Sequence, residues 1–398
     1  MPATDGTRAS VVLGLPTTEA YAAARGPYLG ALVGRYANRL AHGRFPLDGA
    51  GHTVPANDRG HALHGGPDGF DRRVWRATPA PGRHAAVRLT LLSPDGDMGF
   101  PGALEVAVTY RLGADHTLIL DYEARTDRPT VVNLTHHAYF DLTAGQDGLA
   151  AHTLRVPGTR YLPVDAEAIP VGPPAPVDAT PFDLREATVL GPRLTPEAVA
   201  AHPQLAAAGG YDHTWLLDGA PGPDGLRPAA TLATLDGSRA MEVWTTEPAV
   251  QVYTGNQLDA SLTGTDGRPL TRHRAVCLET QHLPDSPNHP EYPTNRPSAP
   301  ARSSAAAPPT ASRISRGPEP CAGPARTGDG AARTTRSVQP CPRRPGLAPG
   351  STRPPPGRRR PPPRRTTPVR GAPDEVGTLH EELCVLVAQV RRVGGEQQ

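Results

Sequence analysis

Short runs of β-forming residues with polar residues at alternate positions recur along the first three quarters of the chain. A period of two is typical of a strand with one buried and one solvated face. Clusters of glycine, proline and aspartate separate the runs. The pattern predicts an all-β domain, a sandwich or barrel of antiparallel sheets. The predicted strands cover residues 87–92, 104–110, 117–122, 130–135, 240–245, 250–253 and 275–279.

Two segments carry helical signals instead. Thr195 is a suitable cap for a short helix over residues 195–201, with Pro196 at its first position. A second helix is predicted over residues 378–393, because leucines and valines there share one face and a capping box is available at the start. No run approaches the ~18 apolar residues that a membrane-spanning helix needs, so we expect no membrane association.

Composition divides the chain near its last aromatic residue, Tyr292. Beyond it arginine, proline, alanine and serine dominate, as in residues 351–365, and neither strands nor helices tolerate that proline density. We therefore predict three parts. They are a β-sandwich domain over residues 1–293, a disordered low-complexity tail over residues 294–377, and the isolated helix over residues 378–393.

Charge and cysteine content narrow the function classes. The formal net charge is +2 and arginine is concentrated in the tail, so nothing suggests nucleic-acid binding by the folded domain. The 4 cysteines are too widely spread for a disulfide framework or a zinc pattern. The first eight residues lack the apolar segment of a signal peptide. We expect a reducing, cytoplasmic location and no metal.

Two loop-like segments hold candidate ligand-binding side chains. Arg39, beside Asn38, can direct two donors toward vicinal hydroxyls or a carboxylate. His64 precedes paired glycines, which let a ligand approach the imidazole closely. Metal binding by His61 and His64 would need a further carboxylate or thiol to complete the set. Each segment alone also fits an ordinary surface loop.

Two strand-like segments hold candidate acid–base groups. His136 and His137 are consecutive on a predicted strand, so only one can face a given cleft, and the other fits a structural role. Glu279 follows a short apolar strand and is either solvated at the strand end or directed into a site. Taken singly, solvent exposure is the commoner outcome.

A carboxylate facing a histidine suits the opening of a cyclic hemiacetal. The base removes the proton of the C1 hydroxyl while the acid protonates the ring oxygen. Rotation about the C1–C2 bond and reclosure then give the other anomer. This chemistry needs no cofactor.

Taken together, the polar segments resemble the aldose 1-epimerase (galactose mutarotase) family, whose motifs occur here in family order. The resemblance covers roughly residues 8–293. It implies a galactose mutarotase-like supersandwich with a small-molecule sugar in an open cleft. The matching segments are residues 11–14, 34–40, 63–66, 93–102, 133–142, 210–213, 250–256 and 277–288.

The resemblance also implies roles for the candidate residues. Glu279 would be the general base and His137 the general acid, with His64 stabilising the reacting end or sharing the acid role. His136 stands where the family more often has asparagine. Sugar hydroxyls would be bound by Arg39, Asp212 and Gln251, with Asn38 in support.

Two departures from the family pattern suggest an altered coding sequence. The family usually has more strands before residues 11–14 and a closing strand after residues 277–288. Here the pattern ends near Thr294, where the composition becomes rich in arginine and proline. We hypothesise a frameshift near Thr294 and a start assigned too late. A genuine disordered extension is the alternative.

Three other functions remain open at this point. They are a non-catalytic carbohydrate-binding protein of the same superfamily, a sugar-phosphate epimerase, and an inactive truncated or frameshifted product. A base opposite an acid favours the enzyme, because sugar binding alone requires neither.

Overall fold

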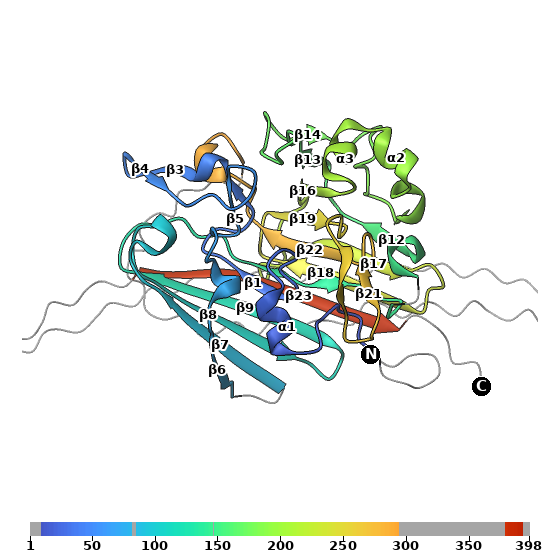
Figure 1. Cartoon of the computed structure of the whole chain (residues 1–398), viewed down its shortest axis with the longest axis horizontal. Helices are drawn as coiled ribbons and strands as arrows, with labels where there is room; N and C mark the ends of the chain where they lie inside the picture. The colour runs from blue at the N-terminus through green and yellow to red at the C-terminus, as the bar shows by residue number, and fades with distance from the viewer. Residues whose placement is uncertain (1–8, 82–84, 146, 294–378, 393–398) are drawn as a thin grey trace, which may run out of the picture. The chain divides into compact units, whose positions relative to one another are not determined.

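Two antiparallel sheets form the main body of the computed structural model, which describes residues 9–81, 85–145, 147–293 and 379–392. The six-stranded sheet runs β11 (Tyr139–Phe140), β22 (Val276–Gln281), β19 (Ala249–Tyr253), β16 (Asp212–Leu216), β13 (Arg160–Leu162) and β14 (Ala175–Pro176). The nine-stranded sheet runs β15 (Thr188–Val189), β12 (His152–Arg155), β17 (Arg227–Thr234), β18 (Arg239–Thr245), β23 (Leu379–Arg392), β9 (Thr117–Thr126), β8 (Leu104–Leu112), β7 (Ala85–Ser93) and β6 (Arg76–Pro79) (Figure 1).

Smaller elements surround the two sheets. Four strand pairs are β1 (Ala31–Val33) with β10 (Thr135–His137), β2 (Arg39–Leu40) with β5 (Ala62–Leu63), β3 (Arg44–Leu47) with β4 (Ala50–Thr53), and β20 (Asp259–Thr263) with β21 (Pro269–Thr271). The α-helices are α1 (Thr18–Ala23), α2 (Pro196–Ala200) and α3 (Pro203–Ala208). The 3-10 helices are Ala41–Gly43, Phe70–Arg72, Asp97–Gly99, Gly148–Ala151, Gly191–Arg193 and Ser286–Asn288.

The hydrophobic core lies between the two large sheets. Alternate residues of β19 and β22, such as Val250, Val252 and Leu278, join one buried cluster with Val108 and Leu120 of the nine-stranded sheet. Apolar surface removed from water in this way is the main stabilising term of a sandwich. The prediction of an all-β antiparallel sandwich is confirmed.

The predicted strands and the first helix agree closely with the structure. Helix α2 is capped by the Thr195 hydroxyl, which accepts from the Ala198 backbone N–H at 3.2 Å. One predicted strand is displaced. Residues 130–134 form no strand beyond an isolated bridge at Asn133, and β10 begins at Thr135. No helix in the described ranges is long and apolar enough to cross a membrane.

The helix predicted over residues 378–393 is wrong. The structure has strand β23 there, paired with β18 on one side and β9 on the other. The physical reason is tertiary, since two neighbouring strands supply a ladder on both sides and the valines also favour extended backbone. The predicted disordered tail, residues 294–377, lies outside the described residues.

An aromatic cluster packs beneath β16. The Trp215 side chain is fully buried, and its indole N–H donates to the Phe182 carbonyl at 2.9 Å. Phe182 in turn stacks on Tyr161 with ring centroids 4.0 Å apart. By contrast, Trp244 on β18 is 37% exposed.

A buried arginine organises the loop that follows β7. Arg35 donates to the Ser93 hydroxyl at 2.6 Å and to the carbonyls of Ser93, Pro94 and Gly102 at 2.8–3.2 Å. Burial lowers the pKa of Arg35 to about 10, although Asp97 and other acids oppose that shift. The loop at residues 93–102 therefore wraps around the Arg35 guanidinium, which has a structural role.

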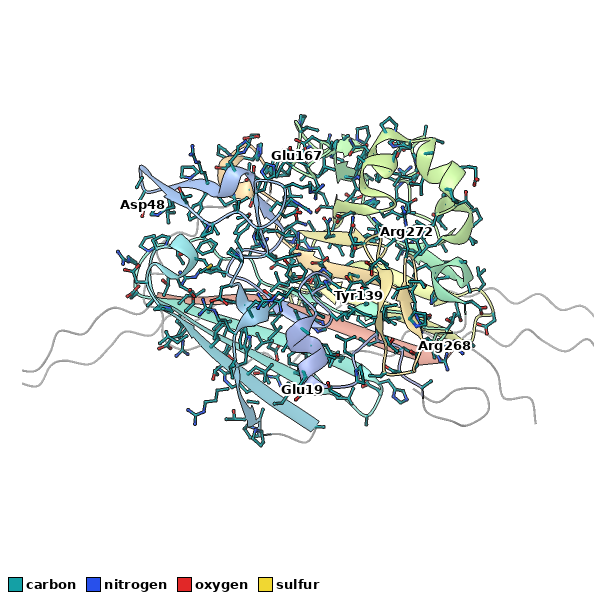
Figure 2. All side chains as sticks on the ribbon, viewed as in Figure 1. Glu19, Asp48, Tyr139, Glu167, Arg268 and Arg272 are labelled. Atoms are coloured by element: carbon teal, nitrogen blue, oxygen red, sulfur yellow. The ribbon has the colours of Figure 1, made fainter. Side chains whose placement is uncertain are left out.

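Charged side chains otherwise lie mostly at the periphery. Figure 2 shows Glu19 and Asp48 at the edge of the ribbon and Tyr139 in its interior. Tyr139 is only 1% exposed, and its hydroxyl donates to the Pro27 carbonyl at 2.7 Å. Tyr139 also lines the cleft described below.

Candidate active site

A cleft of about 680 Å³ opens beside β22 and β10. Six of the seven predicted site residues line it, and they come from separate loops and strands. These six are Asn38, Arg39, His64, His137, Asp212 and Glu279.

Glu279 lies at the centre of this cleft. On β22, Glu279 faces the cleft and Cys277 lies on the same side of the strand, buried with Tyr139 and Tyr253, while Val276 and Leu278 join the main core, as the two-residue period of a strand requires. Glu279 is only 2% exposed. Burial raises the pKa of Glu279 well above its usual value; the charge of Asp212 adds to the shift, and Arg39 opposes it.

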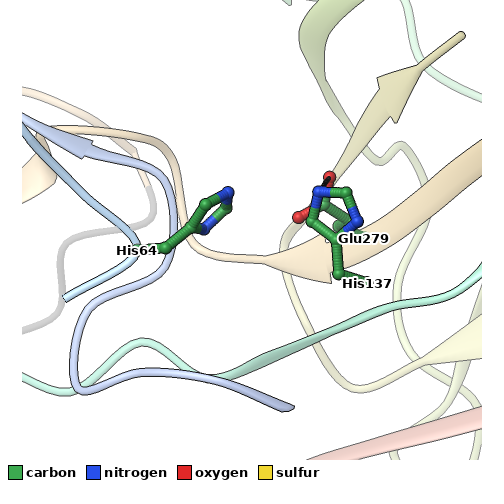
Figure 3. Close-up of side chains that lie close together, drawn as sticks. All are labelled: His64, His137 and Glu279. Atoms are coloured by element: carbon green, nitrogen blue, oxygen red, sulfur yellow. Dashed lines mark ion pairs between the residues drawn. The ribbon is translucent and has the colours of Figure 1, made fainter. Parts of the chain in front are cut away.

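His137 faces Glu279 from β10, with its Nε2 3.6 Å from Glu279 Oε1 (Figure 3). Burial lowers the pKa of His137 to about 4; its own backbone opposes that shift and His136 adds to it. His136 points away, with its ring 5.7 Å from that of Tyr110. The alternation therefore directs the second histidine of the pair, and only that one, to the cleft.

His64 completes a triangle with this pair and points toward it from the other side (Figure 3). Its backbone has φ 53°, and Gly65 follows in the same left-handed region. A Cβ at Gly65 would lie 2.1 Å from the Gly34 carbonyl oxygen, so only glycine fits this turn. The Asn38 backbone N–H donates to His64 Nδ1 at 3.2 Å. Burial, followed by His137 and Arg39, lowers the pKa of His64 well below its usual value.

The predicted hydroxyl-binding residues are organised by hydrogen bonds. Arg39 Nε donates to Asp58 Oδ2 at 2.9 Å, and the Arg39 backbone N–H donates to Asn38 Oδ1 at 2.9 Å. On the opposite wall, Gln251 Nε2 donates to Asp212 Oδ1 at 2.7 Å. Arg39 and Asp212 therefore reach the cleft with their orientations fixed.

Gln251 does not line the cleft itself. Its amide oxygen accepts from the Thr214 hydroxyl and its amide nitrogen donates to Asp212. With both ends occupied and the residue 3% exposed, Gln251 supports Asp212 from behind. The structure brings the other six predicted residues together at the cleft.

Comparison with known proteins accords with this geometry. The sequence model described as "Aldose 1-epimerase" matches residues 2–302. The galactose mutarotase of Rattus norvegicus is 40% identical over 289 residues, which are 72% of this chain and 80% of that protein. The chain belongs to the aldose 1-epimerase family. It is accordingly an isomerase of the epimerase class.

Other members of the family extend the match. The aldose 1-epimerase of Escherichia coli (strain K12) is 39% identical over 294 residues, 74% of this chain and 82% of that protein. The crystal structure of a galactose 1-epimerase from Lactobacillus acidophilus NCFM gives a TM-score of 0.62 at 31% identity, covering 70% of this chain and 78% of that one. The crystal structure of an aldose epimerase homologue from C. elegans gives a TM-score of 0.65 at 26% sequence identity. The match covers 73% of this chain and 84% of that one.

The sequence analysis missed two residues that line the cleft, Tyr28 and Asp58, and one fully buried neighbour of His137, Cys277. The Tyr28 ring lies 4.5 Å from that of His64, and Asp58 pairs with Arg39. Cys277 Sγ lies 3.5 Å from His137 Nδ1. Strand alternation alone could have found Cys277, because residues two apart on β22 share a face.

The donor set of this epimerase also bears on metal binding. Ligand atoms of His64, His137 and Glu279 lie within 4.8 Å of one another, the set that holds catalytic zinc in some hydrolases. However, His64 Nδ1 already accepts from the backbone of Asn38, so its neutral ring carries the proton on Nε2. A metal ligand must offer an unprotonated nitrogen. The hydrogen bonding therefore suits proton chemistry better than coordination.

Proposed function

We propose that this enzyme interconverts the α and β anomers of hexoses, galactose and glucose among them, with Glu279 as the base and His137 as the acid. The observation that carries the proposal is the buried Glu279–His137 contact at the centre of the cleft. The name of the relatives in rat, galactose mutarotase, supports galactose as one substrate.

The two pKa shifts suit the two roles. Burial makes Glu279 hold a proton more tightly than an exposed carboxylate, so it is a better base toward the C1 hydroxyl. Burial makes protonated His137 a stronger acid, so it more readily protonates a weakly basic ring oxygen. Both residues shift in the direction that the reaction needs.

The proposed step balances in protons and electrons. Glu279 takes the C1 hydroxyl proton, the C1=O bond forms, and the bond from C1 to the ring oxygen breaks. The ring oxygen keeps that electron pair and takes a proton from His137. After rotation about C1–C2, His137 takes the proton back from the ring-oxygen hydroxyl as that oxygen attacks C1, and Glu279 returns its proton to the former carbonyl oxygen. The acid and the base are thereby restored.

The cleft walls would orient the sugar for this step. Arg39, fixed by Asp58, would donate to hydroxyls on one side, and Asp212, fixed by Gln251, would accept on the other. Asn38 would support Arg39 through its backbone contact, and His64 would stabilise charge near C1. A neutral sugar suits this cleft, because two of its three arginines, Arg39 and Arg59, already pair with Asp58.

Polarimetry of freshly dissolved α-D-galactose and α-D-glucose tests the proposal. The wild-type protein should accelerate mutarotation, and Glu279→Gln should abolish the acceleration. A folded wild-type protein that binds sugar by calorimetry without accelerating mutarotation would instead favour the carbohydrate-binding alternative. The cytoplasmic location stays a prediction.

A further inference from the structure

The two cleft histidines differ in what contacts their Nδ1 atoms. His64 Nδ1 accepts from the backbone N–H of Asn38 at 3.2 Å, whereas His137 Nδ1 lies 3.5 Å from Sγ of Cys277. A backbone N–H can only donate, but a thiol can either donate or accept. The two imidazoles are therefore not interchangeable as proton carriers.

His64 is confined to one tautomer by its partner. With Nδ1 accepting from Asn38, the neutral ring carries its hydrogen on Nε2. A second proton would have to enter at Nδ1 and would displace the Asn38 N–H. Loss of the Nε2 hydrogen would give an imidazolate, which is inaccessible near neutral pH. His64 therefore donates a hydrogen bond without transferring its proton.

His137 has the opposite requirement. Its Nε2 faces Glu279 Oε1 at 3.6 Å, so Nε2 is the nitrogen positioned to exchange a proton. A ring that gives up a proton at Nε2 and remains neutral must keep a hydrogen on Nδ1. Cys277 Sγ is a side-chain acceptor within reach of that hydrogen, and the His137 ring also interacts with its own backbone.

The thiol also lies beside Tyr139. Burial raises the pKa of Cys277 well above its usual value, with Glu279 and Asp212 adding to the shift, while the Tyr139 side chain opposes it. The Tyr139 hydroxyl itself donates to the Pro27 carbonyl at 2.7 Å. The thiol is therefore neutral, and its sulfur can accept from His137 Nδ1.

We propose that Cys277 is a positioning residue that holds His137 in the Nδ1–H tautomer, while the backbone of Asn38 holds His64 in the Nε2–H tautomer, so that His137 alone exchanges a proton with the sugar. This assignment rests on the proposed function of the cleft. It also removes the acid role from His64, which the sequence left open.

A neutral sulfur suits this task better than a carboxylate would. A carboxylate at Nδ1 orients the ring but also stabilises the imidazolium, which weakens it as an acid. A buried thiol accepts weakly and carries no charge, so it fixes the ring and leaves the imidazolium acidic. The other groups that face the His137 ring are Tyr28, His64, Tyr139, Tyr253 and Glu279.

Nitrogen NMR of the ¹⁵N-histidine-labelled full chain tests the tautomers directly. At neutral pH, His64 should show a protonated Nε2 and His137 a protonated Nδ1, with assignments from His64→Gln and His137→Gln. In Cys277→Val the His137 signal should move toward a tautomer mixture while His64 stays unchanged. A wild-type His137 protonated at Nε2 would overturn the proposal, whether or not Cys277→Val folds.

Kinetics of a matched pair of variants supply the second readout. Cys277→Val fills the space without a donor or acceptor, whereas Cys277→Ser keeps both. We expect kcat to fall about ten-fold in Cys277→Val with KM unchanged, and about three-fold or less in Cys277→Ser. Equal losses in both variants, or none in Cys277→Val, would contradict the hydrogen-bond role.

The two failures are distinguishable. If the proposed function is wrong, the wild-type protein will be inactive although its tautomers are as described. If the role of Cys277 is wrong, the wild-type protein will be active with a different His137 tautomer.

Discussion

The two large sheets treat their polar residues in opposite ways. On the nine-stranded sheet, Arg88 and Glu123 pair at 2.6 Å between β7 and β9, with side chains 36% and 42% exposed. On the six-stranded sheet, β19 and β22 bury every residue, Gln251 and Glu279 included. Water solvates the first set, whereas the second set is desolvated, with Glu279 at the cleft and Gln251 behind it. A polar residue in a strand therefore points to function when the strand itself is buried on both faces.

The largest expected contrast is at Glu279. Glu279→Gln should lower kcat about 100- to 10,000-fold, because the amide cannot accept the C1 proton. Stability should respond in the other direction. The folded pKa of Glu279 is raised, so its contribution to stability is present below the unfolded value of 4.5 and is lost as pH rises through the folded pKa. Urea unfolding at neutral pH should therefore find the variant at least as stable as wild type.

A lower urea midpoint for Glu279→Gln would contradict the view that the carboxylate is retained for function. His136→Gln is a useful companion variant, since that ring lies on the same strand as His137 but points away from the cleft. Its kcat should stay close to the wild-type value.

The next effect is on stability. Arg35→Met should lower the free energy of unfolding by about 3 kcal/mol, because the carbonyls and hydroxyl around the guanidinium lose a buried donor. Thermal or urea unfolding measures the loss. Arg76→Met, on the exposed edge strand β6, should change it by less than about 0.5 kcal/mol. Equal losses would show that the hydrogen bonds around Arg35 do not stabilise the protein.

A pH shift comes third. The charge of Asp212 helps to raise the pKa of Glu279, so Asp212→Asn should lower that pKa. The acidic limb of kcat/KM against pH should move to lower pH, and KM should rise as a sugar ligand is weakened. Asp218→Asn, an exposed acid just beyond β16, serves as the control. A limb that stays in place would rule out Glu279 as the group that titrates there.

The smallest effect belongs to the solvated sheet. Glu123→Gln should cost less than about 1 kcal/mol, because exposed ion pairs are screened and their side chains lose entropy on pairing. Mutarotase activity should be unchanged. A loss comparable to that of Arg35→Met would erase the distinction between the two sheets.

Much of the fold could be predicted because strand periodicity is local. The strands that became β7, β8, β9, β18, β19 and β22 and the cap at Thr195 all follow from short-range pattern. The segment at residues 378–393 shows the limit of this approach. Its apolar spacing is compatible with a helix, but the segment pairs as a strand between β18 and β9. That outcome depends on partners distant in sequence, which no local pattern contains.

The site divides in the same way. The residue types of Glu279, His137 and Arg39 and their family motifs were visible in sequence, and the structure brings them to one cleft. The position of Gln251 behind Asp212 and the contact of Cys277 with His137 were not, because both depend on side-chain packing between strands. Which side chains hydrogen-bond to one another around a site depends on residues that are close in space but distant in sequence.

The three tryptophans give the molecule a built-in optical readout. Trp215 is fully buried beneath the strands of the cleft, Trp75 donates to the Phe70 carbonyl in a half-buried setting, and Trp244 is partly open to water on the other sheet. Indoles in dry surroundings emit at shorter wavelengths than wetted ones. Loss of emission at the blue edge of the spectrum will therefore report the exposure of Trp215, and with it the unfolding of the strands beside the cleft.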